Sequence, residues 1–184
     1  MNFELVPLNE KHLAQFKKDM QEAFQQGAVD GFGEMEVEIL PESHINRSLK
    51  TKGSIAYEAF ADGVSVGGAI VVIDEETQHN HLDFLYVKVG TQSKGIGQAI
   101  WKSIEELHPQ TKAWETCTPY FEKRNIHFYV NRCGFHIVEF FNKYHKDPNG
   151  PNKYGSDEVL GKSDYFEGMF LFEKVMRVPP KSRL

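Results

Sequence analysis

The sequence has few cysteines, no long apolar run and no excess of positive charge, and each absence excludes a class of protein. Its two cysteines, Cys117 and Cys133, are too far apart for a C-x-x-C metal or redox pair, so we expect core thiols. The longest apolar run, Ala69 to Ile73, is far shorter than the roughly 20 residues that cross a bilayer. We therefore expect neither a membrane-spanning protein nor a metal site.

The deficit of positive charge argues against nucleic acid as a partner. The 184 residues include 21 Lys and Arg against 26 Asp and Glu, a net charge of -5, and the basic residues are scattered along the chain. The first residues contain no apolar stretch of the kind that a secretory signal needs. We expect a cytoplasmic protein whose acidic balance suits a cationic acceptor such as an amine.

The sequence contains enough apolar residues to form one hydrophobic core. A composition of 40% hydrophobic and 26% charged residues is typical of globular proteins and too apolar for a disordered chain. A chain of this length fits one domain. We place that domain at residues 1–177 and a polar tail at 178–184.

Hydrophobic periodicity predicts strands and helices along most of the chain. After a short strand at Phe3 to Leu5, Asn9 can cap a helix that Gly27 would end, and Pro41 can start a second helix that runs to Leu49. Strands are predicted at 55–60, 64–73, 81–87, 112–118, 135–141 and 169–176, and helices at 98–107 and 121–131. The first three of these strands form an antiparallel meander.

A glycine loop joins the third strand of that meander to a helix, and it reads Gln92-x-x-Gly95-x-Gly97. The first N–H groups of a helix lack intrahelical partners and lie at its positive dipole end, and glycine lets an anion approach them. This arrangement predicts a site for a pyrophosphate. It is neither a Rossmann loop, which needs a third glycine, nor a P-loop, which needs Gly-Lys-Ser/Thr.

Two motifs in this order resemble those of the GNAT (Gcn5-related N-acetyltransferase) superfamily. The loop residues match the acyl-CoA signature Gln/Arg-x-x-Gly-x-Gly/Ala, and Tyr129 to Phe135 is similar to the family's Tyr-x-x-x-x-Gly-Phe element. The likeness covers nearly the whole chain. It implies an α/β fold with a mixed, mostly antiparallel sheet of about seven strands, splayed between the fourth and fifth strands and flanked by about four helices.

The same resemblance implies acetyl-CoA as cosubstrate, without a metal, and direct acyl transfer to a primary amine in a ternary complex. Asn125 is a weaker cofactor ligand than the others, because the family's usual asparagine lies seven residues before the tyrosine, where this sequence has Glu122. The implied cofactor contacts are Leu85, Tyr86, Val87, Gln92, Ser93, Lys94, Gly95, Ile96, Gly97, Gln98 and Asn125.

Amine acetylation needs a base, because an alkylammonium has a pKa near ~10.4. His81 and Asp83 are the candidates. Period-two alternation places them on one strand face with Leu85 and Val87, and the run is similar to His-Leu-His-x-Leu-x-Val in arylalkylamine acetyltransferases. The alternative for His81 and Asp83 is a purely structural role. Glu34, Glu36 and Glu38 form a second carboxylate set, for which a solvated loop is the plainer interpretation.

The remaining chemistry needs an oxyanion donor and a proton for the leaving thiolate. The resemblance implies a backbone N–H near Leu85 to Val87 as the donor and Tyr129 as the general acid, with an amphipathic core tyrosine as the alternative. Cys117 has no assigned base and is expected to be a core thiol rather than an acyl carrier.

Three interpretations of the acceptor stay open at this point. The first is a small amine, the second is a protein or peptide amine, and the third is a GNAT-like domain that binds acyl-CoA without turnover. The connection at residues 142–167 is long for a compact domain and carries aromatic and acidic residues. It could serve as an acceptor lid or as the contact of a homodimer.

Overall fold

The computed structural model describes residues 2–34, 36–91, 95–148 and 168–177. Three predictions therefore fall outside the described residues, wholly or in part. Gln92, Ser93 and Lys94 of the glycine loop lie outside them, as do residues 149–167 of the long connection and the tail at 178–184. The single-domain boundary at 177 stays a prediction.

Seven strands form one mixed sheet in the order β1-β2-β3-β4-β5-β7-β6. Strands β1 to β4 are antiparallel neighbours, β4 and β5 are parallel, and β7 pairs antiparallel with both β5 and β6. The predicted fold class is confirmed. The strands are β1 (Phe3–Pro7), β2 (Ser54–Ala61), β3 (Val64–Val72), β4 (His79–Val87), β5 (Ala113–Pro119), β6 (His136–Asn142) and β7 (Gly168–Val175).

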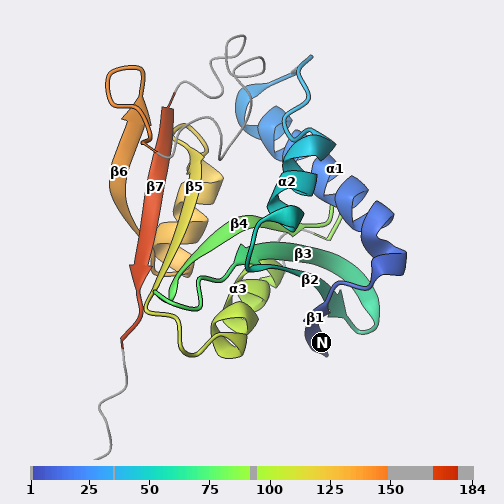
Figure 1. The fold of residues 1–184 in the computed structure, drawn as a ribbon. Helices are drawn as coiled ribbons and strands as arrows, with labels where there is room; N and C mark the ends of the chain where they lie inside the picture. Colours follow the sequence, from blue (N-terminus) through green and yellow to red (C-terminus); the bar gives the residue numbers. More distant parts are fainter. Residues whose placement is uncertain (1, 35, 92–94, 149–167, 178–184) are drawn as a thin grey trace, which may run out of the picture.

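Helices cover both faces of the sheet (Figure 1). On one face lie α1 (Leu13–Phe32), which follows the 3₁₀ turn η1 (Glu10–His12), and α2 (Glu42–Lys50). On the other face, α3 (Ile96–Leu107) shares a hydrophobic cluster with the helix formed by α4 (Lys123–His127) and the π-helical turn η2 (Phe128–Arg132). The two faces of the sheet are therefore covered by different helices, α1 and α2 on one and α3, α4 and η2 on the other.

The predicted end of the first helix at Gly27 is wrong, because α1 continues to Phe32 and ends at Gly33, which has φ 93°. A glycine inside a helix costs only about 1 kcal/mol relative to alanine, which tertiary packing outweighs. Ala28, in the added turn, is fully buried and clusters with Ile39 and Phe121. The extension thus brings α1 into contact with the segment that follows β5.

The predicted splay between the fourth and fifth strands is confirmed. β4 and β5 pair over three residues only, from His79 opposite Ala113 to His81 opposite Glu115. Beyond that point the two strands separate, and Figure 1 shows β5, β7 and β6 turning away from the half formed by β1 to β4. The edge of β4 from Leu82 onwards therefore faces a gap rather than a strand.

A bulge in β4 changes which side chains share a face. Ile70 lies opposite Phe84 and Val71 lies opposite Leu82, so Asp83 is an extra residue in the ladder. Leu82 consequently packs in the same cluster as Leu85 and Val87, on the α3 side. The prediction that His81 and Asp83 share their face with Leu85 and Val87 is wrong, since strict alternation cannot survive an inserted residue.

Candidate active site

A cavity of about 890 Å³ occupies the gap between β4 and β5 and continues to the inner sides of α1 and α2. One end is formed by the start of α3 and by η2, and the other by α1 and α2. Every described cofactor residue that the sequence predicted lies in its wall, namely Leu85, Tyr86, Val87, Gly95, Ile96, Gly97, Gln98 and Asn125. His81, Asp83 and Tyr129 line it as well.

The first turn of α3 forms one end of this cavity. Gly95 caps the helix in the left-handed region, with φ 74°, a conformation that favours glycine. A Cβ on Gly97 would lie 3.2 Å from the Phe128 ring. This position must therefore be glycine for α3 to pack closely against η2. The N–H groups at the start of α3 can then face an anion in the cavity.

Three basic side chains of the cavity wall, Arg124, His127 and Arg132, were missed by the sequence reasoning, and Arg132 lies beside the first turn of α3, where its carbonyl accepts from Gln98. They come from α4 and η2, the same helical segment that carries Tyr129. Arg124 and His127 are three residues apart, which places them on one side of a helix, and this spacing was the available signal; Arg132 follows in the π turn. Cationic groups beside a helix N-terminus strengthen the case for a phosphorylated ligand.

The edge of β4 that faces the gap offers backbone donors. The Lys88 N–H donates to the Val66 carbonyl at 2.9 Å, so residue 88 is turned toward β3. Because successive residues of a strand alternate, Leu85 and Val87 turn their N–H groups away from β3 and into the gap. This is the region where the resemblance placed the oxyanion donor.

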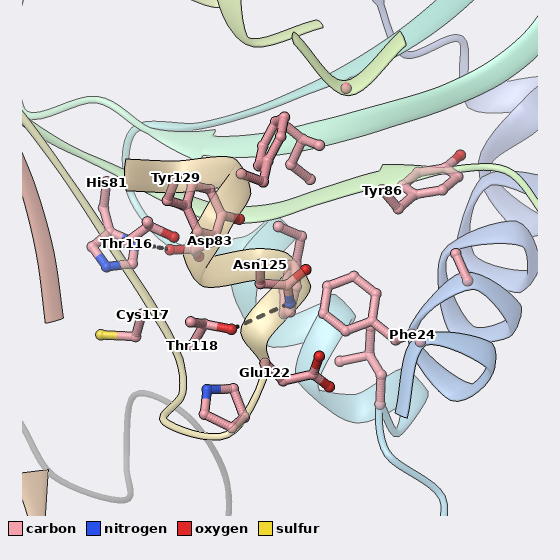
Figure 2. A pocket seen from close by; sticks show the side chains of 18 of the residues that line it. Phe24, His81, Asp83, Tyr86, Thr116, Cys117, Thr118, Glu122, Asn125 and Tyr129 are labelled. Atoms are coloured by element: carbon pink, nitrogen blue, oxygen red, sulfur yellow. Dashed lines mark hydrogen bonds and ion pairs between the residues drawn. The ribbon is translucent and has the colours of Figure 1, made fainter. Parts of the chain in front are cut away.

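Tyr129 is nearly fully buried at the point where the strands separate (Figure 2). It lies in the π turn, in which the Cys133 N–H donates to the Phe128 carbonyl at 3.0 Å, and such turns recur at functional sites. Burial raises the pKa of Tyr129, and a hydrogen bond with Thr116 opposes this only in part. The phenol is therefore a neutral proton donor at physiological pH.

His81, Asp83 and Ser48 form a hydrogen-bonded chain from β4 to α2. The His81 Nδ1 lies 2.7 Å from one Asp83 carboxylate oxygen, and the Ser48 hydroxyl donates to the other at 2.5 Å. A carboxylate can only accept, so it selects the Nδ1–H tautomer of a neutral imidazole. The bulge at Asp83 makes this chain, because it turns Asp83 toward α2.

Other predicted residues have mixed outcomes. Asn125 donates to the Thr118 hydroxyl at 3.3 Å and lines the cavity, and its role as a cofactor ligand stays a prediction. Glu34, Glu36 and Glu38 lie within the described residues and are absent from the cavity wall, so the alternative carboxylate set gains no support. The helix predicted at 121–131 begins two residues later than expected, at Lys123, and its second half is the π turn.

The prediction of two core thiols is wrong for one of them. Cys133 is buried, and burial, more than the opposing charge of Lys174, raises the pKa of its thiol to about 12. Cys117, by contrast, is only half-buried and lines the cavity. The side chains of β5 alternate, so the one after buried Thr116 faces the opposite way.

The part of the chain that the structure describes contains neither a candidate metal centre nor a candidate membrane span. No group of three or more His, Cys, Asp or Glu there could hold a metal ion. None of the helices described above combines the length and the apolar character that crossing a membrane requires.

Comparisons with known proteins agree with this geometry. A model of the acetyltransferase (GNAT) family matches residues 15–135. In sequence, the uncharacterized protein YrkN of Bacillus subtilis (strain 168) is 43% identical over 171 residues, which cover 91% of this chain and 90% of YrkN.

Solved structures with a similar fold include two N-acetyltransferases. The ribosomal-protein-S18-alanine N-acetyltransferase from Escherichia coli has a TM-score of 0.68 at 11% identity, and 100% of this chain and 99% of that chain are covered. The PaiA N-acetyltransferase from Thermoplasma acidophilum, in complex with coenzyme A, has a TM-score of 0.65 at 18% identity, with 96% and 100% covered. At these identities the likeness shows the fold alone.

Proposed function

The chain belongs to the GNAT acetyltransferase family, and on that basis we propose that it transfers an acetyl group from acetyl-CoA to a primary amine. The observation that carries the proposal is the gap beyond His81 and Glu115. It lies between the anion-binding start of α3 and a buried, neutral Tyr129. A substrate with a phosphorylated head and a reactive thioester end matches these two features.

Acetyl-CoA would enter the gap from the α3 side. Its pyrophosphate would accept hydrogen bonds from the first N–H groups of α3, with Arg124 and Arg132 nearby to neutralise phosphate charge. Its extended arm would lie along the unpaired edge of β4, where the N–H groups of Leu85 and Val87 point into the gap. This assignment brings the thioester close to Tyr129, at the vertex of the gap, which is the point where β4 and β5 separate.

His81 would remove the proton that an ammonium acceptor carries at neutral pH. Asp83 positions the imidazole, because its carboxylate accepts from Nδ1 and leaves Nε2 as the basic nitrogen. Ser48 in turn fixes the carboxylate. The neutral amine then attacks the thioester carbonyl, and a β4 N–H stabilises the oxyanion that forms.

Tyr129 would donate its proton to the departing thiolate. A thiol has an ordinary pKa near ~8.5, well below that of a buried phenol, so the transfer must accompany bond cleavage rather than precede it. The Thr116 hydroxyl holds the phenol at the vertex. As the intermediate collapses, the nitrogen releases its second proton, which restores the Tyr129 phenol, while His81 passes the first proton to solvent. The products are coenzyme A with a free thiol and the N-acetylated amine.

A small amine fits the acceptor side better than a protein does. The last turns of α1 cross the open end of the gap, where Ala28 and Ile39 pack with Phe121. A protein acceptor would need an open groove at this end. We therefore propose a small-molecule amine, whereas the Escherichia coli relative is named for a ribosomal protein acceptor.

A screen of acceptors with acetyl-CoA tests the proposal. Amines and peptides are incubated with the protein, acetylated products are identified by mass spectrometry, and free thiol is measured in parallel. The expected result is acetylation of one class of small amine with matching thiol release. Coenzyme A binding without acetylation of any acceptor would leave an acyl-CoA-binding domain instead.

A further inference from the structure

An apolar compartment extends the cavity on the face of the sheet that α1 and α2 cover. Its apolar lining consists of Ala23, Phe24, Gly27, Ile39, Leu40 and Phe84. The rings of Phe24 on α1 and Phe84 on β4 meet edge to face, with centroids 5.7 Å apart. Figure 2 shows Phe24 beside α1, across the pocket from His81. The compartment is therefore a part of the cavity that the proposed chemistry does not use.

Gly27 keeps part of this compartment open. It lies in the interior of α1, where glycine is the least favourable residue after proline. Its φ is not positive, so the backbone conformation does not require glycine. A Cβ at this position would meet no atom of the described residues within 4 Å, its own stretch of helix aside. Because Gly27 also lines the cavity, this space is available to a ligand.

The compartment lies on the same face of the sheet as the proposed base. The bulge in β4 turns Asp83 toward Ser48 of α2, and Phe84 packs in the cluster that joins α1, α2 and β4. Leu85, by contrast, packs in the cluster on the α3 side. An amine whose nitrogen lies beside His81 thus has its body next to α1 and α2, away from the phosphates of the cofactor.

Charge along the cavity wall does not favour a second charged group on the acceptor. Besides its histidines, the described part of the wall carries three arginines and four carboxylates, which are Arg47, Arg124, Arg132, Asp74, Asp83, Glu115 and Glu122. Glu122, which borders the compartment near Gly31, makes an interaction of its own within the protein, as does Arg47. With charges this nearly balanced, burial of apolar surface is the main source of acceptor affinity.

We propose that the acceptor is an amine with an apolar body, aliphatic or aromatic, and that Gly27 sets how long this body is. The inference rests on the proposed N-acetyltransferase function. The amino nitrogen lies beside His81, and the body passes the Phe24 and Phe84 rings to end in the open space at Gly27. Each methylene group that leaves water for this compartment strengthens binding by a similar increment until the space is full.

The experiment compares acceptors of graded length and matched polarity. Steady-state kinetics with saturating acetyl-CoA are measured for n-alkylamines from ethylamine to octylamine, and for amino alcohols, α,ω-diamines and ω-amino acids of the same lengths. For the alkylamines, kcat/KM should rise about 3- to 4-fold with each added methylene and fall once the chain exceeds the compartment. The amino alcohols should lie about 10-fold or more below alkylamines of equal length, because their hydroxyl is buried among apolar groups.

Three variants of α1 test the role of Gly27. Gly27→Ala and Gly27→Leu should shorten the optimum alkylamine by about one and about three to four methylene groups, the bulk that each side chain adds. Gly31→Ala is the matched control. It replaces a glycine of the same helix one turn later, outside the cavity wall, where the added Cβ would be in ordinary contact with Glu122 at 3.7 Å. It should leave the optimum where it is, and all three proteins should bind coenzyme A alike.

Calorimetry measures the same contact without turnover. The complex of the protein with coenzyme A is titrated with butylamine and with hexylamine at several temperatures. The heat capacity change of binding should be negative and larger in magnitude for hexylamine, because more apolar surface is buried. In Gly27→Leu this difference between the two amines should disappear.

Distinct outcomes would overturn the inference. A kcat/KM that does not depend on chain length would contradict it, as would an optimum that Gly27→Leu leaves in place. A preference for diamines or ω-amino acids would assign recognition to charged groups of the wall. Loss of coenzyme A affinity in Gly27→Leu would place the compartment on the cofactor side. Acetylation of polar amines alone would leave the proposed function intact, whereas failure to acetylate any amine, despite coenzyme A binding, would reject that function.

Discussion

The Thr116 hydroxyl donates a hydrogen bond to the Leu82 carbonyl at 2.9 Å, one residue beyond the last paired residues of β5 and β4. A side chain thus replaces the backbone ladder where the two strands begin to separate. The same hydroxyl interacts with the Tyr129 phenol. Thr116 therefore couples the vertex of the gap to the proposed general acid.

Replacing Thr116 with valine should lower both stability and turnover. The shape is kept, but the buried Leu82 carbonyl loses its donor, which costs about 1–3 kcal/mol of the free energy of unfolding. Urea denaturation and steady-state kinetics measure the two effects.

Thr118→Val is the matched control, since Thr118 is also buried on β5 but accepts a 3.3 Å bond from the Asn125 side chain instead of bonding the β4 backbone. Equal losses of turnover in the two variants would contradict a special role for the vertex.

The Ser48→Ala protein should turn over about 10-fold more slowly, because the Asp83 carboxylate loses a hydrogen bond that fixes the orientation of His81. Affinity for coenzyme A should stay unchanged. Ser48→Thr restores the hydroxyl and should recover most of the rate. If Ser48 were only structural, Ser48→Ala would lower the melting temperature along with kcat/KM, and Ser48→Thr would not recover the rate. Asp83→Asn would then leave the pH profile of the reaction unaltered.

Alanine at Gly97 should weaken coenzyme A binding by about 10-fold, because the new methyl group would press on the Phe128 ring 3.2 Å away and shift α3 from η2. Titration calorimetry measures the affinity.

Gly27→Ala provides the contrast, since nothing lies within 4 Å of the added Cβ. It should raise the free energy of unfolding by about 1 kcal/mol and leave coenzyme A affinity unchanged. If both variants bound coenzyme A like the unaltered protein, the α3 end would not be the cofactor site.

Thiol alkylation should report cofactor binding through Cys117 alone. Cys117 lines the cavity, whereas Cys133 is buried and its raised pKa of about 12 keeps it protonated. Intact and peptide mass spectrometry should find the label on Cys117, and coenzyme A should slow its addition. Labelling of Cys133 first, or no protection by coenzyme A, would be inconsistent with this site.

Periodicity and turn chemistry predicted most of the fold, and the described glycines of the loop, Gly95 and Gly97, lie in the cavity wall. Two errors have a common physical origin, because local rules were overruled by tertiary contacts. Packing of Ala28 against Ile39 and Phe121 carries α1 past Gly27. The extra residue at Asp83 was invisible to an alternation argument, yet it is what directs Asp83 to Ser48.

Residues that act across the fold could not be predicted from a single sequence. Ser48 lies 35 residues before Asp83, and Glu122 meets α1 only because that helix is longer than expected. Arg132 lies three residues after Tyr129, a same-side spacing, so its place in the cavity wall could have been inferred once Tyr129 was assigned.

The most direct test of the proposed function is the chemical step of Tyr129→Phe. With an acceptor identified by the screen, single-turnover acetyl transfer is measured beside calorimetric binding of coenzyme A. Loss of the phenolic proton should lower the transfer rate by about 10- to 10⁴-fold and leave coenzyme A affinity nearly unchanged. Unaltered transfer under conditions where chemistry limits the rate would reduce Tyr129 to a packing residue and contradict the mechanism.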